Sequence, residues 1–155
     1  MMKLLEKLKN RKSNNKGFSL VELIIVIAIM AILIGIVGTQ VVPYIEKSKE
    51  SKDLQLVNSY STAAVSAYSQ EAGKLTSTGS ITVKVYADGE TGDAAILQAK
   101  IKELVGYDTL PTIQGKMGSK KGKNITGITI VIDPTSHTVT TTADGTGLDP
   151  VNADL

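Results

Sequence analysis

The sequence has 155 residues, of which 42% are hydrophobic, with one histidine and no cysteine. This length is sufficient for one domain and a short additional segment. The missing cysteines exclude a disulfide-stapled fold and, with a single histidine, argue against a structural zinc site.

The net charge of +2 combines two segments of opposite charge. Residues 1–17 carry six basic residues and one acidic residue, a net charge of +5. The rest of the chain carries 11 basic and 14 acidic residues, a net charge of −3. A basic flank of a membrane span stays in the cytoplasm, so we expect residues 1–17 to orient the chain and the C-terminal part to lie outside.

An apolar run of 20 residues extends from Leu23 to Val42, and it contains no polar side chain before Thr39. A helix needs roughly 20 apolar residues to cross a bilayer. A secretory signal peptide has a shorter apolar core that is followed by a small-residue cleavage site. Here the small residue, Gly17, precedes the run. We therefore expect any cleavage to leave the apolar run in the product.

Residues 16–23 read KGFSLVEL, so that Glu22 is the one acidic residue at the edge of the apolar run. This stretch, up to about Ile34, resembles the class III signal of type IV pilins and pseudopilins. That signal is a basic leader ending in glycine, then phenylalanine, a small polar residue, two aliphatic residues, glutamate and a long aliphatic run. Many Gram-negative pilins also carry a C-terminal disulfide, and its absence here favours a Gram-positive, major-pilin-like protein.

The resemblance implies that a prepilin peptidase cuts between Gly17 and Phe18 and methylates the new amine of Phe18. It also implies that Glu22 meets the N-terminal amine of a neighbouring subunit during assembly. An ionisable residue at a membrane span is costly and usually has a partner, which agrees with this role. The expected organisation is a leader that is removed (1–17), a transmembrane and filament-core helix (18–42) and an extracellular globular domain (43–155).

Three residues weaken the helix near the end of the apolar run, namely Gly35, Gly38 and Pro43. Glycine costs about 1 kcal/mol relative to alanine in a helix, and proline removes a hydrogen bond. Pilins often have a proline at the position of Thr39. We expect the helix to kink or melt between Gly35 and Pro43 during assembly.

The helix is expected to continue as an amphipathic half. Residues 46–53 are polar, with Lys49 and Asp53 spaced for an i,i+4 ion pair. An apolar stripe at helical spacing follows, and Gly73 is a plausible end of the helix. The stripe consists of Leu54, Leu56, Val57, Tyr60, Ala64, Val65, Tyr68 and Ala72.

The C-terminal half predicts strands and one helix. Residues 81–86 alternate as in a strand and end at a turn at Asp88 and Gly89. Asp93 is predicted to cap a helix over 94–105 that ends at Gly106, with an inward face of Ile96, Leu97, Ile101, Leu104 and Val105.

Residues 111–124 are predicted to form a loop, and strands 125–132 and 137–142 to form a hairpin around residues 133–136. The polar tail after Gly145 is predicted to be irregular. The expected fold class is α+β, a long N-terminal helix packed on a small antiparallel sheet.

Candidates for chemistry are few. Asp133, Ser136 and His137 are too close in sequence to converge as a catalytic triad. The segment 118–124 has the wrong glycine spacing for a phosphate-binding loop. We therefore expect no enzyme activity, no cofactor and no metal.

A lysine-rich segment contains Lys116, Lys120, Lys121 and Lys123. One interpretation is contact with nucleic acid or another anionic surface, in which each lysine neutralises a phosphate. The preferred interpretation is a solvated segment or a salt-bridging contact with the next subunit, since no aromatic residue is interleaved for base stacking.

The sequence thus predicts a structural subunit that is stored in the membrane and polymerised by the pilus assembly machinery into a homo-oligomeric helical surface filament for adhesion or motility. One alternative is a pseudopilin of a type II secretion-like or competence DNA-uptake system. An alternative of another class is a single-pass anchored binding module that never polymerises.

Overall fold

The computed structural model describes residues 17–145 and 147–155. The chain forms two compact units, Met1–Val42 and Pro43–Leu155. The predicted leader lies outside the described residues, except for Gly17.

Within the first unit, the described residues are helical from Leu20 onward. Ser19 is the N-cap of helix α2 (Leu20–Ile36), and a π-helical segment, η1 (Val37–Val41), follows directly. None of the residues of α2 is buried. Helical conformation continues without interruption from Leu20 to Lys74, and this is the one helix among the described residues that is long and apolar enough to span a membrane. The predicted long N-terminal helix is confirmed.

In the second unit the helix continues as α3 (Val42–Glu71), which ends in a short 3-10 turn, η2 (Ala72–Lys74). The predicted apolar stripe is confirmed at its centre, where Val57, Tyr60 and Ala64 are fully buried. At its end the prediction is wrong, because Ala72 is exposed. The stripe therefore covers the middle of α3.

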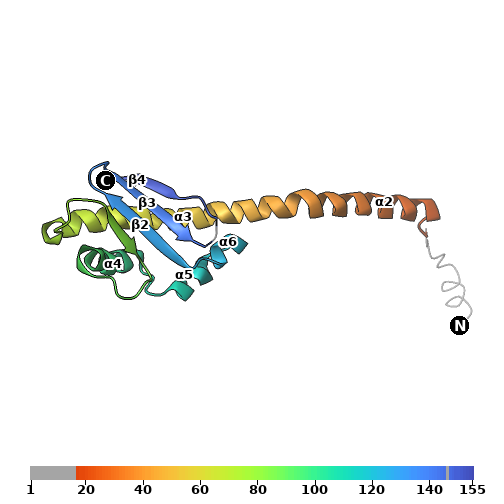
Figure 1. The fold of residues 1–155 in the computed structure, drawn as a ribbon. Coiled ribbons are helices and arrows are strands. Elements are labelled where there is room, and N and C mark those ends of the chain that lie inside the picture. Colours follow the sequence, from red (N-terminus) through yellow and green to blue (C-terminus); the bar gives the residue numbers. More distant parts are fainter. Residues whose placement is uncertain (1–16, 146) are drawn as a thin grey trace, which may run out of the picture. The chain divides into compact units, whose positions relative to one another are not determined.

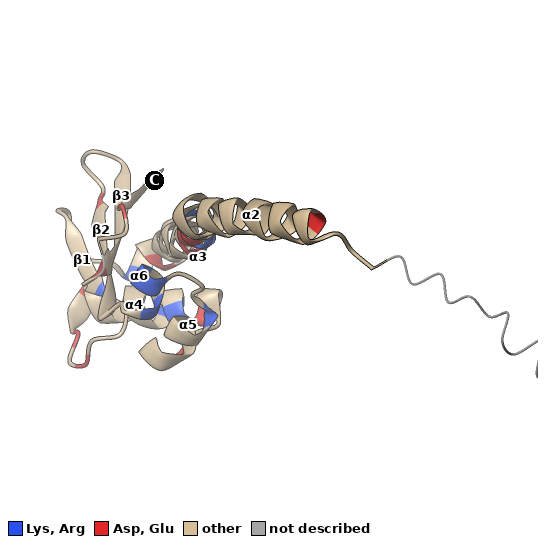
Figure 2. Ribbon diagram, turned by 90° about the vertical axis from the view of Figure 1, so that its right-hand side faces the viewer, with Lys and Arg blue, Asp and Glu red and all other residues tan. Residues whose placement is uncertain are grey.

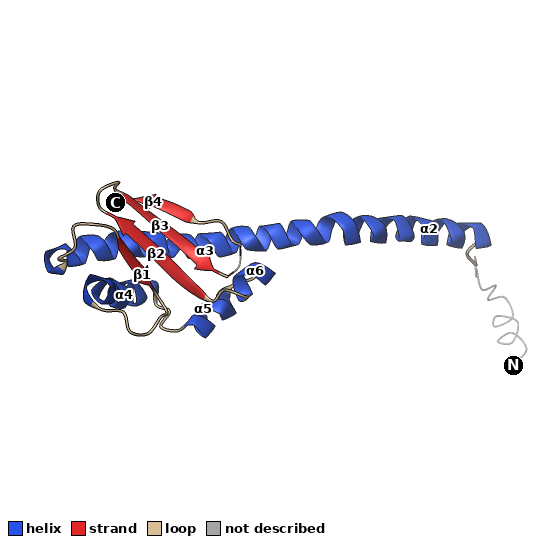
Figure 3. Ribbon diagram, in the orientation of Figure 1, coloured by secondary structure: helices blue, strands red, loops and turns tan. Residues whose placement is uncertain are grey.

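Four strands form one antiparallel sheet in the order β1-β2-β3-β4. Their bounds are Ile81–Lys84, Gly127–Asp133, Thr138–Asp144 and Val151–Asp154. On β2 and β3 buried and partly exposed residues alternate, as expected for a sheet with one covered face. The helices of the second unit lie on that one face, with α3 running behind the strands in the views of Figures 1 and 3. The predicted α+β fold is therefore confirmed.

Three shorter helices connect β1 to β2: α4 (Gly92–Val105), α5 (Leu110–Lys116) and α6 (Lys120–Lys123). The prediction of a loop over 111–124 is wrong, because α5 and α6 occupy most of this segment. Pro111 lies in the first turn of α5, where the helix does not use the backbone N–H that proline lacks.

Two details of α4 also differ from the prediction. Its N-cap is Thr91, and Asp93 lies inside the first turn. Leu97 and Ile101 are fully buried as predicted, whereas Leu104 is 41% exposed. Gly106 ends the helix in the left-handed conformation at φ 73°, as its lack of a Cβ allows.

The polar tail is ordered by pairing with β3. Thr140 lies opposite Asn152 in the register, and its Oγ1 donates to Asn152 Oδ1 at 2.9 Å. The backbone N–H of Leu155 donates to the carbonyl of His137 at 3.0 Å. The prediction of an irregular tail is therefore wrong, because β4 satisfies the edge of the sheet that β3 would otherwise expose.

Candidate functional site

The first candidate site is the start of α2, at Phe18 to Glu22. The backbone N–H of Ser19 donates to Glu22 Oε2 at 2.8 Å, and Ser19 Oγ accepts from the N–H of Val21 at 3.4 Å. These bonds form a capping box, which satisfies backbone donors that the helix leaves free at its first turn. The Glu22 carboxylate is thus held at the positive end of the helix dipole.

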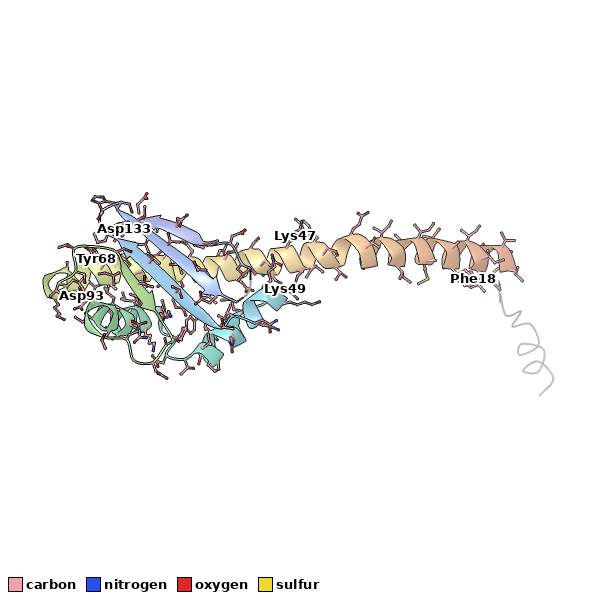
Figure 4. The ribbon with its side chains drawn as sticks, viewed as in Figure 1. Phe18, Lys47, Lys49, Tyr68, Asp93 and Asp133 are labelled. Carbon is pink, nitrogen blue, oxygen red and sulfur yellow. The ribbon has the colours of Figure 1, made fainter. Side chains whose placement is uncertain are left out.

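Phe18 directly precedes this cap and lies 88% exposed. Figure 4 labels it at the very start of the helix. A cut between Gly17 and Phe18 would leave the new amine one residue away from the capping box. Since a carboxylate accepts several hydrogen bonds, the bond from Ser19 leaves Glu22 capacity for a cation.

The apolar side chains of α2 are exposed, and none of its residues is buried. The large ones from Leu20 to Ile36 are between 46% and 73% exposed. Contiguous apolar surface of this extent marks contact with a membrane or another protein. The segment therefore needs an apolar environment beyond that formed within the described residues of its own unit.

The segment from Gly35 to Pro43 is helical, with one π-helical turn in its middle. Thr39 Oγ1 donates to the carbonyl of Gly35 at 2.9 Å, a side-chain bond that competes with the backbone ladder and often bends helices. Single π turns are frequent at functional positions. The predicted kink or melting at Gly35, Gly38 and Pro43 concerns the assembled state, and it stays a prediction.

The second candidate site is the lysine-rich segment. Lys116 ends α5, and Lys120, Lys121 and Lys123 lie on α6; all four are exposed. Figure 2 shows the basic residues of α6 next to charged residues of α3. The structure thus brings the four predicted lysines onto two neighbouring short helices.

Asp53 of α3 attaches this segment. Its carboxylate accepts from the N–H of Gly118 at 2.8 Å, from the N–H of Ser119 at 2.9 Å and from the hydroxyl of Ser119. The residue is only 2% exposed. The predicted Lys49–Asp53 ion pair is wrong, because Asp53 turns inward to these donors and forms no ion pair among the described residues. Sequence reasoning missed this contact, since its partners are 65 and 66 residues away.

Further contacts hold α6 along α3. The backbone N–H of Lys120 donates to Glu46 Oε1, and Lys121 Nζ lies 3.1 Å from Glu50 Oε2. Gly122 lies so close to Asp53 that a Cβ would collide with its carboxylate and would lie 2.9 Å from Met117 Cβ. Glycine is therefore required where α6 approaches α3.

The other conspicuous polar residues have structural partners. Asp93 accepts from the N–H groups of Thr76, at 3.0 Å, and Ser77, at 2.6 Å. These bonds, led by those from Ser77, lower the pKa of Asp93. Figure 4 shows Asp93 at the start of α4. Asp93 therefore ties α4 to the segment after η2.

The hairpin residues form a turn and not a charge-relay system. Asp133 Oδ1 accepts from the N–H groups of Thr135 and Ser136, and bonds from Ser136 and Thr135 lower its pKa. The Ser136 hydroxyl pairs with Thr138 Oγ1 at 2.8 Å. In residues 17–145 and 147–155, no three histidine, cysteine or acidic residues are grouped as metal ligands.

Comparison with known proteins gives one family match. Residues 12–38 match the family described as the prokaryotic N-terminal methylation motif. The matched range includes Gly17, Phe18 and Glu22, so it covers the first candidate site and most of the apolar run. Neither curated proteins nor solved structures give a match to the chain.

Proposed function

We propose that this chain, which carries the class III prepilin signal of the type IV pilin and pseudopilin family, is a structural subunit of a type IV pilus. The signal and the apolar helix support a membrane-anchored precursor that prepilin peptidase processes. The finer proposal is that the processed subunit leaves the membrane and polymerises into a helical surface filament. It acts as a building block and not as an enzyme.

The observation that carries the proposal is the uncovered apolar surface of α2 directly after a capped Glu22. When α2 leaves lipid, its apolar side chains need another apolar environment, which the same helix of other copies supplies. Where different faces of this helix meet in successive copies and the rotation does not close into a ring, such contacts produce an open helical filament. The Glu22 carboxylate then pairs with the methylated amine of Phe18 on a neighbouring copy, which remains cationic near neutral pH.

A pseudopilin of a secretion or DNA-uptake system shares this signal and builds a shorter fibre. The two functions differ in the length and location of the polymer. An anchored binding module that never polymerises would differ from both, because its function would not depend on Glu22.

The test separates the charge of Glu22 from its role in the helix cap. Glu22→Gln removes the charge and keeps an oxygen that can accept the Ser19 N–H. Glu22→Ala removes both, and Ser19→Ala weakens the cap and leaves the carboxylate. Each variant is expressed in a host with a pilus assembly system, and surface filaments are sheared and counted by electron microscopy.

We expect Glu22→Gln and Glu22→Ala to abolish filaments while the amount of chain in the membrane is unchanged. Ser19→Ala should still assemble, because its carboxylate is intact. Wild-type filament counts from Glu22→Gln would show that the charge is not used. Counts that fall only in Ser19→Ala and Glu22→Ala would assign Glu22 to the cap alone and contradict the proposed pairing.

A further inference from the structure

The charges of residues 43–155 are strongly separated. Two segments, 46–53 and 116–123, contain seven lysines and three acidic residues, a net charge of +4. The rest of residues 43–155 contains four lysines and ten acidic residues, a net charge of −6. The seven lysines, called here the lysine cluster, are all exposed: Lys47, Lys49, Lys52, Lys116, Lys120, Lys121 and Lys123.

The fold brings the two segments together. Glu46, Glu50 and Asp53 lie on one face of α3, at i, i+4 and i+7, and each contacts the segment 118–121. Glu46 and Asp53 bind backbone N–H groups there, so they use their charge to hold α6 and not to pair with an ammonium group. Among the described residues, Lys121 is the only member of the lysine cluster in an ion pair.

The lysine cluster lies next to the membrane span in the chain. Glu46 is the first charged residue after Glu22, and it follows Val42 by four residues. Four residues reach at most about 14 Å even when fully extended. Tyr44, which is 75% exposed, lies between them and is of a type enriched at the membrane–water interface. Figure 4 shows Lys47 and Lys49 on this part of α3, with Lys49 beside α6.

We propose that the lysine cluster binds the anionic headgroups of the leaflet from which residues 43–155 emerge, and so docks the unassembled subunit on the membrane surface. Each lysine near an anionic membrane surface favours the bound state over the unbound state by about fivefold. The acidic remainder of the domain is repelled by the same surface, so the charge separation favours an orientation in which the end of the domain that carries the lysine cluster faces the lipid. Nucleic acid fits less well, because the cluster contains no aromatic side chain for stacking.

The test uses the full-length chain in lipid nanodiscs. Since the chain has no cysteine, Gly115→Cys gives a single labelling position on α5, beside the lysine cluster and with open space around it. A fluorophore at this position is quenched by lipids that carry a headgroup spin label. Quenching is compared in nanodiscs with and without phosphatidylglycerol.

The chain offers a matched control. In the test variant Lys116, Lys120, Lys121 and Lys123 are changed to Gln, and in the control variant the four lysines outside the cluster, Lys74, Lys84, Lys100 and Lys102, are changed to Gln. Both variants lose the same charge from the same domain. Thermal unfolding followed by circular dichroism verifies that each variant folds.

We expect phosphatidylglycerol to increase the docked population, which is measured as the quenched fraction of the fluorophore. In anionic nanodiscs, the test variant should have a ratio of docked to undocked domains at least about tenfold lower than the wild type. The control variant should keep the wild-type ratio. Salt should release the wild-type domain, since the screening length falls to about 3 Å at about 1 M. This salt arm tests the proposal without any lysine variant. Equal quenching in neutral and anionic nanodiscs would overturn the proposal. So would a test variant that loses filaments with unchanged quenching, because that result would assign the lysines to subunit contacts.

Discussion

Helices α2 and α3 differ in a way that their hydrophobicity alone does not suggest. The strongly apolar α2 has no buried residue, whereas α3, which is about half polar, buries Asp53, Val57, Tyr60, Ser61, Ala63, Ala64 and Ala67. Most of these side chains are small. One direct contact is the hydrogen bond from Ser61 Oγ to Thr141 Oγ1 at 2.8 Å.

The difference shows that the two segments have different partners. The partner of α3 is the chain's own sheet and the helices on the same face. The apolar face of α2 is exposed in the described residues, and surface of this kind marks contact with a membrane or another protein. Changes in α3 should therefore alter folding, and changes in α2 should alter membrane retention and assembly.

The largest expected effect on folding is at Asp53. Asp53→Ala leaves the buried donors of Ser119 without their acceptor, and we expect it to lower the free energy of unfolding by about 3 kcal/mol. Denaturant unfolding measures the loss. The control is Lys52→Ala at the adjacent exposed position, with an expected change within about 0.5 kcal/mol. Equal effects of the two changes would mean that the Asp53 contact does not hold α6.

A matched pair of valines compares the two helices directly. Val57 of α3 is fully buried, and Val26 of α2 is 48% exposed. We expect Val57→Ala to lower the free energy of unfolding of the domain by about 2 kcal/mol, because it leaves a cavity. Val26→Ala should leave that free energy unchanged. A comparable loss from both changes would contradict the assignment of different partners.

A smaller effect is expected at the tyrosine pair. The hydroxyls of Tyr60 and Tyr86 lie 2.6 Å apart, and Tyr86 also donates to the carbonyl of Tyr107 at 3.2 Å. Tyr60→Phe should lower the free energy of unfolding by about 1 kcal/mol, which is the net contribution of a typical hydrogen bond. Tyr44→Phe, at an exposed position, should leave the free energy of unfolding unchanged in the same denaturant measurement.

The same pair predicts a pH dependence. Burial raises the pKa of Tyr60 and of Tyr86 above its ordinary value, so both stay protonated in the folded domain. The unfolded chain loses these protons above about pH 10, and stability should fall as the pH rises beyond that value. Tyr60→Phe should flatten this fall in unfolding curves measured from pH 8 to pH 11. An unchanged slope would contradict the protonated pair.

The features that the sequence predicted correctly rest on local patterns. The apolar run, the stripe of α3 and the hairpin at Asp133 each follow from neighbouring residues. The Asp133 turn, for example, needs only donors two and three residues further on.

The features that were missed depend on distant partners. Segment 111–124 contains Gly115, Gly118 and Gly122, which favour a loop, and α6 is held by a carboxylate far away in the sequence. Strand β4 has a polar sequence that gains its order from the exposed edge of β3. Asp53 lies in a run of charged residues and gives no sign in the sequence that it is buried. Only tertiary contacts decide these elements.

The N-terminus of sheared surface filaments tests most directly whether α2 is retained in the polymer. Mass spectrometry of that material should give a chain that begins at Phe18 with a methylated amine and includes Glu22 and the whole apolar run. A product that begins beyond Tyr44, with α2 discarded, would contradict a filament built from this helix.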